Sequence, residues 1–266
     1  MKKVMAIIAG AALMASCAEE SPKALVLYYS QTGATETVAR AIQAKTGADI
    51  EAFDVVEAYD GDYNATIQRC MSERSSGFVP TLSPISSDLS KYDVIFLGYP
   101  IWFGSYAPPV QALLAGVDLP GKKIVPFSTF GSGGLVESSN DLKKALPQSE
   151  IAEGFGIRNG RIQYTEEEVN AFLVAGGYIE GTYEPLPGYS EQAELTEEEM
   201  AIYEEATGDY PMPIGQPLSV GSRAVNGGTD YLYVINGSGP AGNPVEGKVY
   251  VSCREGRKAE FTLVVR

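Results

Sequence analysis

Hydroxyl and glycine residues are concentrated in one short segment, Ser30 to Thr35, with the sequence Ser-Gln-Thr-Gly-Ala-Thr. The preceding run 24–29 is apolar without alternation, which predicts a fully buried strand of a parallel sheet. From residue 35 to residue 42 the apolar side chains recur at helical spacing. A strand, a short loop and a helix in succession direct backbone N–H groups and the positive end of a helix dipole at one point. The segment therefore predicts a socket for a phosphate group.

The composition of this segment limits which phosphate ligand it suits. It contains no Lys or Arg, it lacks the Gly-Lys-Ser/Thr ending of a Walker loop, and it lacks the three spaced glycines of a dinucleotide fingerprint. Hydroxyls and amides alone suit a ligand with one terminal monoester. The alternative is a Ser/Thr-rich turn that only caps the helix.

A second segment carries aromatic residues. A buried strand is predicted at Asp93–Leu97, and it leads into a loop framed by Gly and Pro, residues 98–109, which contains the only tryptophan, Trp102, next to Phe103. Flat aromatic side chains pack well against flat ring systems. We therefore expect a platform for a ligand ring, and the alternative is an apolar cluster that seals the sheet edge.

A third segment is rich in glycine. A strand is predicted at Lys122–Ser128, and Thr129–Gly134 follows with the sequence Thr-Phe-Gly-Ser-Gly-Gly. Glycines let bare backbone N–H and C=O groups approach a ligand closely. Such groups suit the polar edge of a ring.

The elements between these segments complete an α/β pattern. Further strands are expected at 50–55 and 151–157, and helices at 65–75, 135–145 and 165–174, the last with a Thr165/Glu168 capping box. The chain thus predicts a doubly wound five-stranded parallel sheet. The long connection 56–91 is either a wall over the site, with Tyr59, Tyr63 and Phe78 as contacts, or a surface excursion.

Together the three segments, in this order, resemble the flavodoxin-like family, in its short-chain bacterial form, over residues 24–176. The resemblance implies strand order 2-1-3-4-5 and FMN as the cofactor, with the phosphate in the first segment, the flavin ring against the second, and its pyrimidine edge along the third. Phe103 stands where a second Trp is expected. The cofactor-binding residues implied are Ser30, Gln31, Thr32, Gly33, Ala34, Thr35, Pro100, Ile101, Trp102, Phe103, Gly104, Thr129, Phe130, Gly131, Ser132, Gly133 and Gly134.

The remainder of the chain has a different pattern. Residues 177–192 form a Gly/Pro/Tyr linker, and residues 193–266 predict an α+β unit. Its expected elements are an acidic amphipathic helix, 195–207, and four strands, 218–225, 231–236, 248–253 and 259–265. The string Arg223-Ala-Val-Asn-Gly227 resembles the protease-binding hairpin of the cystatin family, but Arg223 replaces a glutamine. We expect docking or structural packing rather than inhibition.

The first residues predict export. Lys2 and Lys3 precede an apolar stretch that is too short to span a bilayer, and small residues lead to Cys17. The Leu-Met-Ala-Ser-Cys end resembles a bacterial lipoprotein box, which implies a signal peptide at 1–16, acylation of Cys17 and a lipid anchor in the cell envelope. The alternative is a plain secretory peptide with an incidental cysteine.

Composition excludes several functions. The chain has no histidine, so Ser-His-Asp triads, His-ligated haem and most zinc sites are excluded, and no metal site is expected. The formal net charge is −14, and without Lys2 and Lys3 it is −16, which excludes nucleic-acid binding. Such acidity also disfavours adding an electron to a flavin. We expect Cys70 and Cys253 to be isolated, buried thiols rather than a disulfide.

The function expected from the sequence is an FMN-binding protein outside the cytoplasm that transfers electrons or reduces a small acceptor such as a quinone. The flavin supplies the chemistry, and no catalytic side chain is nominated. The alternative is a non-catalytic, lipid-anchored binding module whose C-terminal unit docks a partner or protease. The redox partner is not identified by the sequence.

Overall fold

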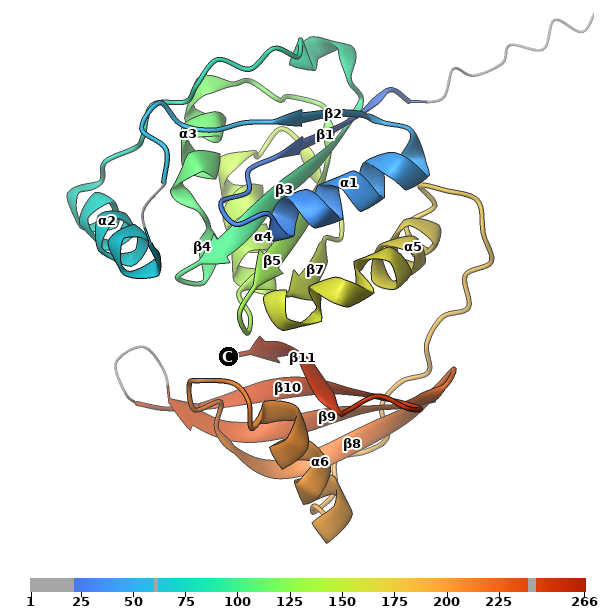
Figure 1. Ribbon diagram of the computed structural model, residues 1–266. Coiled ribbons are helices and arrows are strands. Elements are labelled where there is room, and N and C mark those ends of the chain that lie inside the picture. Colours follow the sequence, from blue (N-terminus) through green and yellow to red (C-terminus); the bar gives the residue numbers. More distant parts are fainter. Residues whose placement is uncertain (1–21, 60–61, 239–242) are drawn as a thin grey trace, which may run out of the picture.

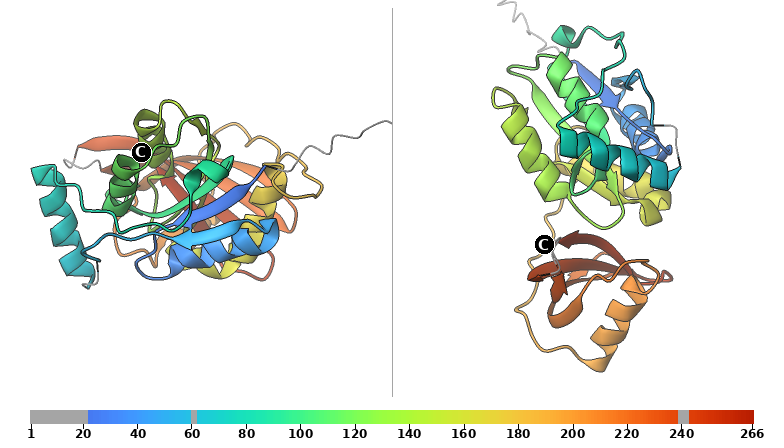
Figure 2. Two further views of the ribbon diagram at one scale, coloured as in Figure 1. Left: turned by 90° about the horizontal axis from the view of Figure 1, so that it is seen from above. Right: turned by 90° about the vertical axis from the view of Figure 1, so that its left-hand side faces the viewer.

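The computed structural model describes residues 22–59, 62–238 and 243–266. The predicted signal peptide and Cys17 lie outside these residues. A sheet with helices on both faces lies above a second, smaller sheet, and an extended connection links the two (Figure 1). Figure 2 shows the same two parts stacked when the molecule is viewed from the side.

The larger sheet is parallel and has the order β2-β1-β3-β5, with β6 and β7 both pairing with β5. This confirms the predicted flavodoxin-like order 2-1-3-4-5. Its strands are β1 (Ala24–Tyr28), β2 (Asp49–Ala52), β3 (Val94–Trp102), β5 (Lys123–Phe130), β6 (Glu150–Ile151) and β7 (Phe155–Arg158).

The fifth predicted strand, 151–157, is broken into β6 and β7. The break lies opposite Pro126 of β5, which has no N–H group to donate to a neighbouring strand. A Cβ added to Gly154 would lie 2.9 Å from the Pro126 ring, so only glycine fits at position 154 beside the proline.

Helices cover both faces of this sheet. They are α1 (Ala34–Thr46), α3 (Pro108–Gly116), α4 (Leu135–Ala145) and α5 (Thr165–Ala175), whereas α2 (Tyr63–Ser76) lies to one side of the sheet (Figure 1). One core cluster lies between the sheet and α1 with α5, and includes Val38, Phe127 and Leu173. The other lies on the opposite face against α3 and α4, and includes Leu113 and Leu142. Short 3₁₀ turns occur at Leu89–Lys91 and Asn159–Tyr164.

The described residues of the C-terminal unit, 193–238 and 243–266, form one helix and an antiparallel sheet, as predicted. They are α6 (Glu197–Thr207), β8 (Gln216–Val225), β9 (Gly228–Ser238), β10 (Pro244–Arg254) and β11 (Glu260–Val265), and the strand order is β11-β10-β9-β8. Tyr203 and Ala206 of α6 pack on the sheet and, with Tyr233 and Phe261, form its core. Each strand of the sheet neighbours the next one along the chain, so the sheet is a meander.

The capping box predicted at Thr165 and Glu168 is wrong. Tyr164 is the N-cap of α5 and makes no side-chain cap. The Thr165 hydroxyl donates to the Ile162 carbonyl, and Glu168 accepts from Arg161. The 3₁₀ turn that precedes α5 therefore takes the place of a side-chain cap. A capping box does form at the start of α6, between Thr196 and Glu199.

The two cysteines of the described chain are free thiols. Cys70 is buried, as predicted, whereas Cys253 is only half-buried. Across the described residues, no helix combines the length and apolar character that a membrane span requires.

Candidate functional site

The three segments singled out in the sequence meet at one edge of the parallel sheet. They leave the carboxyl ends of neighbouring strands, because Tyr28 of β1 pairs with Gly98 of β3, and Pro100 of β3 pairs with Thr129 of β5. The hydroxyls of Thr35 and Thr129 lie 2.9 Å apart, which links the first segment to the third. The third contacts the second as well, since a Cβ added to Gly134 would lie 2.6 Å from the Ile101 side chain.

The phosphate loop, Ser30–Thr35, is shaped by Gly33, the N-cap of α1, which has φ of 89°. The Ser30 hydroxyl accepts from the amides of Gly33 and Glu36, each at 3.2 Å. The amides of Ala34 and Thr35, in the first turn of α1, have no intrahelical acceptor. Converging amides and hydroxyls without a cationic side chain form a donor set that fits a phosphate monoester.

Gln31 has a structural role within this loop. Its amide nitrogen donates to the Tyr59 carbonyl at 2.9 Å and to the Thr66 hydroxyl at 2.7 Å. The Gln31 side chain therefore links the phosphate loop to the long connection that follows β2, while the Gln31 backbone remains in the loop. Thr32 is exposed and Thr35 is buried.

The aromatic segment differs from the loop that the sequence predicts. Strand β3 continues to Trp102 and pairs with β4 (Ser105–Tyr106) as a hairpin. The turn uses Phe103 and Gly104, both with positive φ, 51° and 79°. Alternation along the extended strand makes Tyr99 a buried core residue, so Trp102 and Phe103 are the aromatic side chains at the rim.

Trp102 is held by two tyrosine rings. Its ring centroid lies 6.1 Å from that of Tyr29 and 5.2 Å from that of Tyr59, and both contacts are edge-to-face. The indole is half-buried and its orientation is fixed by these edges. Phe103 is 50% exposed, and the Arg74 guanidinium lies 5.8 Å from its ring centroid.

The connection after β2 contributes one of its three predicted contacts to this cluster. Tyr59 is buried, donates its hydroxyl to Glu73, and has the Arg69 guanidinium 3.8 Å from its ring centroid. Tyr63 and Phe78 are instead 79% and 52% exposed. The connection is therefore anchored to the rim through Tyr59 and Gln31.

Tyr29 and Tyr59 of this cluster, together with the core residue Tyr99, make folding sensitive to alkaline pH. Burial raises the pKa of Tyr29, Tyr59 and Tyr99, and Glu73 raises that of Tyr59 further. A raised folded-state pKa stabilises the fold below the unfolded pKa of about 10 and loses that contribution as the pH rises. We expect the free energy of unfolding, from chemical denaturation, to fall above about pH 10 by up to about 1.4 kcal/mol per pH unit for each tyrosine.

Two substitutions check the origin of this fall. Tyr99→Phe should make the free energy of unfolding fall less steeply with pH. Tyr63→Phe, at an exposed position, should leave the steepness of this fall unchanged. A free energy of unfolding that stays constant up to about pH 11 would contradict the assignment.

The glycine loop, residues 131–134, follows β5. Thr129 and Phe130, which the sequence places in this loop, are the buried last residues of the strand. The Gly131 carbonyl accepts from Arg158 Nε at 2.7 Å, and the Ser132 carbonyl accepts from the Val264 amide at 2.8 Å. The sequence shows neither contact, because Arg158 ends β7 and Val264 belongs to β11.

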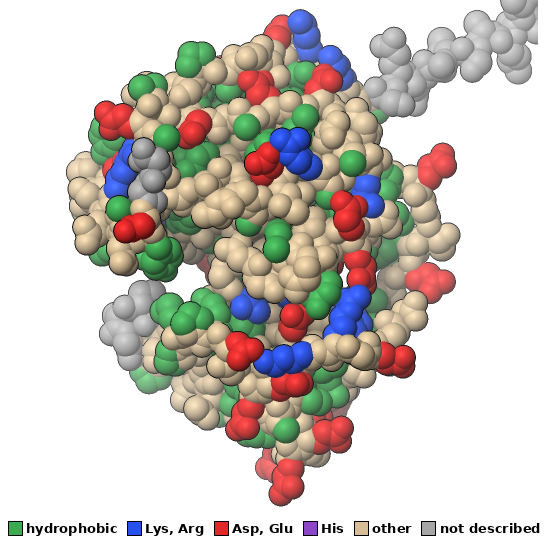
Figure 3. Space-filling model, in the orientation of Figure 1, with side chains coloured by type: hydrophobic (Ala, Val, Ile, Leu, Met, Phe, Trp, Pro, Cys, Tyr) green, Lys and Arg blue, Asp and Glu red, His purple; other side chains and the backbone are tan. Residues whose placement is uncertain are grey.

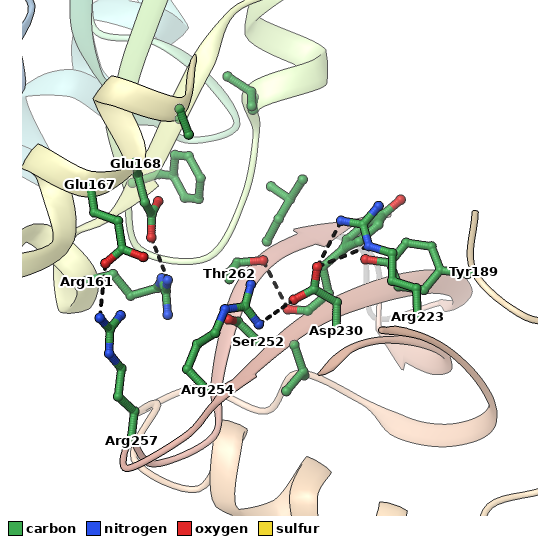
Figure 4. Close-up of a pocket in the computed structure, with 17 residues that line it drawn as sticks. Arg161, Glu167, Glu168, Tyr189, Arg223, Asp230, Ser252, Arg254, Arg257 and Thr262 are labelled. Carbon is green, nitrogen blue, oxygen red and sulfur yellow. Dashed lines mark hydrogen bonds and ion pairs between the residues drawn. The ribbon is translucent and has the colours of Figure 1, made fainter. Parts of the chain in front are cut away.

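The parallel-sheet part meets the C-terminal unit along a charged seam. Acidic and basic side chains alternate there (Figure 3), and a cavity of about 420 Å³ opens between the two parts (Figure 4). Arg161 bridges Glu168 and Glu260, and Arg257 pairs with Glu167. These ion pairs join α5 and the turn before it to the C-terminal unit.

On the far side of this cavity, Asp230 accepts from both Arg223 and Arg254. A second cavity, of about 310 Å³, lies beside α2 and is lined by residues that include Arg74, Phe78 and Asp141. In the described part of the chain, no group of three His, Cys, Asp or Glu side chains is arranged to hold a metal ion.

Comparison with known proteins found similar solved structures and a matching family model. A crystal structure from Bacteroides eggerthii, of a protein assigned as a flavoprotein, has 29% sequence identity and a TM-score of 0.52, covering 58% of this chain and 98% of that one. A similar protein from Bacteroides uniformis has 23% identity and a TM-score of 0.50, covering 57% and 99%. A Lactobacillus acidophilus flavoprotein solved with FMN has 22% identity and a TM-score of 0.46, covering 56% and 99%. The flavodoxin family model matches residues 23–174, more than half of the chain, and the chain therefore belongs to the flavodoxin family.

Proposed function

We propose that this protein binds FMN at the edge where its three loops meet and uses it to carry electrons or to reduce a small acceptor of the quinone type. The observation that carries the proposal is the phosphate loop, a segment without Lys or Arg in which hydroxyls and helix N-terminal amides converge. Membership of the flavodoxin family supports it. FMN, when bound, supplies the redox chemistry.

The chain's own residues have distinct tasks in this proposal. The phosphate loop holds the monoester through amides and the hydroxyls of Ser30, Thr32 and Thr35. Trp102, fixed by Tyr29 and Tyr59, supplies an aromatic surface beside the ring. The glycine loop presents backbone N–H groups to the polar edge of the ring. None of these residues transfers a proton.

The proposal is tested by reconstitution. Purified protein is mixed with FMN, separated from free cofactor by gel filtration and examined for the yellow absorbance of oxidised flavin. We expect one FMN per chain to remain bound. Stepwise chemical reduction of the bound FMN then shows whether it takes up its two electrons in one step or in two. Protein that stays colourless with excess FMN favours a non-catalytic binding module instead.

Replacing Trp102 by Ala tests the ring contact separately from the phosphate contact. Loss of one aromatic contact is worth about 1 kcal/mol, so we expect FMN to bind about five- to tenfold more weakly. Phe103→Ala removes the neighbouring, exposed aromatic ring. Comparing its FMN affinity with that of Trp102→Ala shows how much of the loss belongs to the indole itself. Unchanged affinity in Trp102→Ala, measured by calorimetry, would remove the indole from the site.

We further propose that the protein is exported and anchored by lipid at Cys17. The basic, apolar and small residues before Cys17 support this proposal. Cells that express the protein and take up a labelled fatty acid should label the wild type. The Cys17→Ser variant should carry no label, and equal labelling of both would exclude acylation at this position.

For the C-terminal unit we propose a structural role rather than protease inhibition. Arg223, which stands in the cystatin-like string, donates twice to Asp230 and faces the seam with the parallel-sheet part. Its guanidinium lies 4.4 Å from the Tyr189 ring centroid. A side chain engaged in this way serves packing, so the full chain should leave papain active, and inhibition at nanomolar concentration would contradict this role.

A further inference from the structure

One cation is bonded to the glycine loop at the candidate flavin site, and it is held there by the C-terminal unit. Arg158, the last residue of β7, donates from Nε to the Gly131 carbonyl at 2.7 Å and from Nη1 to the Phe261 carbonyl at 2.8 Å. One guanidinium therefore joins the glycine loop to β11. The two bonds connect parts that are far apart in the sequence.

Among the residues that the structure describes, no carboxylate pairs with Arg158 to offset its charge. Both of its hydrogen-bond acceptors are neutral carbonyls, and within the described ranges it forms no salt bridge. Its neighbour Arg161, by contrast, lies between the carboxylates of Glu168 and Glu260. Burial lowers the pKa of Arg158 to about 10, so the guanidinium still carries its proton at neutral pH.

The C-terminal unit fixes both the cation and the loop beneath it. The Arg158 guanidinium lies 3.3 Å from the Phe261 ring centroid and 5.5 Å from that of Tyr210. Val264 of β11 donates to the Ser132 carbonyl and forms a bridge with Gly133. A Cβ added to Gly133 would lie 2.1 Å from the Val264 carbonyl oxygen, so the two backbones meet without room for a side chain.

From this arrangement we propose that Arg158 sets the reduction potential of the bound flavin and that the C-terminal unit positions Arg158 for this task. The inference rests on the proposed function, because it takes the glycine loop as the part of the site that lines the ring. Reduction adds negative charge to the flavin. A fixed, half-buried positive charge next to the loop stabilises that added charge, whereas the surrounding acidic surface opposes it.

The test compares midpoint potentials of the FMN-loaded full chain, measured by reductive titration against a reference dye. In Arg158→Gln, which removes the charge and keeps a donor, we expect the preference for reduced over oxidised FMN to fall about tenfold, equivalent to about 30 mV for a two-electron couple. Arg158→Lys keeps the charge and should recover most of the wild-type potential.

Arg257→Gln is the matched control, because it removes a guanidinium from the same seam whose charge the Glu167 carboxylate already offsets. Its potential should match that of the wild type. An unchanged potential in Arg158→Gln, or an equal fall in both Gln variants, would overturn the inference while leaving FMN binding intact. Failure of the wild type to bind FMN would instead overturn the proposed function on which the inference rests.

Discussion

Thr32→Asp should weaken FMN binding by roughly a hundredfold to a thousandfold. Thr32 is exposed in the middle of the phosphate loop, where amides converge and no cation offsets a negative charge. A carboxylate about 4 Å from a phosphate charge is repelled by about 4 kcal/mol at an effective dielectric constant of 20. The fold should tolerate the change, because a negative charge near a helix N-terminus is favourable. Calorimetric titration with FMN measures the loss.

Two comparisons isolate the phosphate as the cause. Thr37→Asp puts the same charge at an exposed position further along α1, where solvent screening should limit the loss of affinity to less than about tenfold. Riboflavin, which lacks the phosphate, should bind equally to the wild type and Thr32→Asp. Equal weakening of FMN and riboflavin would show that the loop does not contact the phosphate.

Gly98→Ala should destabilise the parallel sheet beneath the site by about 3 kcal/mol. Gly98 pairs with Phe127 across β3 and β5, and an added Cβ would lie 2.1 Å from an atom of the Phe127 ring. Phe127 is fully buried, so its ring cannot move aside without disturbing the packing against α1 and α5. The free energy of unfolding from urea denaturation measures the effect.

Gly116→Ala is the corresponding control. Gly116 ends α3, and its added Cβ would lie 3.5 Å from Leu82, an ordinary contact. Alanine also favours helix over glycine, so stability should hold or rise by up to about 1 kcal/mol. If Gly98→Ala were as stable as Gly116→Ala, the tight approach of β3 to the Phe127 ring would not exist in solution.

The sequence was sufficient to predict buried parallel strands with three loops at their carboxyl ends, because these follow from local patterns, whereas the strand order 2-1-3-4-5 came from the resemblance to the flavodoxin-like family. Buried apolar runs followed by glycine or hydroxyl residues identify strand ends, and neighbouring parallel strands bring those ends to one edge. Ser30, Trp102 and Gly131 were placed at this edge by that argument. The helix and antiparallel strands after residue 193 were predicted from their periodicity in the same way.

Other features depend on contacts that sequence patterns do not show. The hairpin at Phe103 requires two successive positive φ values, one at a non-glycine residue, and no local pattern predicts this. Pro126 breaks the pairing of a strand that lies far along the chain. The bonds from Arg158 to Gly131 and Phe261 require knowing how the C-terminal unit docks.

The central claim, that FMN occupies the edge where the three loops meet, is tested most directly through the single tryptophan. Trp102 lies in the aromatic cluster at that edge, and no other indole contributes to the emission. FMN titrated into the protein should quench tryptophan emission to a limit at one FMN per chain, with a dissociation constant of about 1 μM or below. Emission that declines no more than that of free tryptophan mixed with FMN would contradict the account.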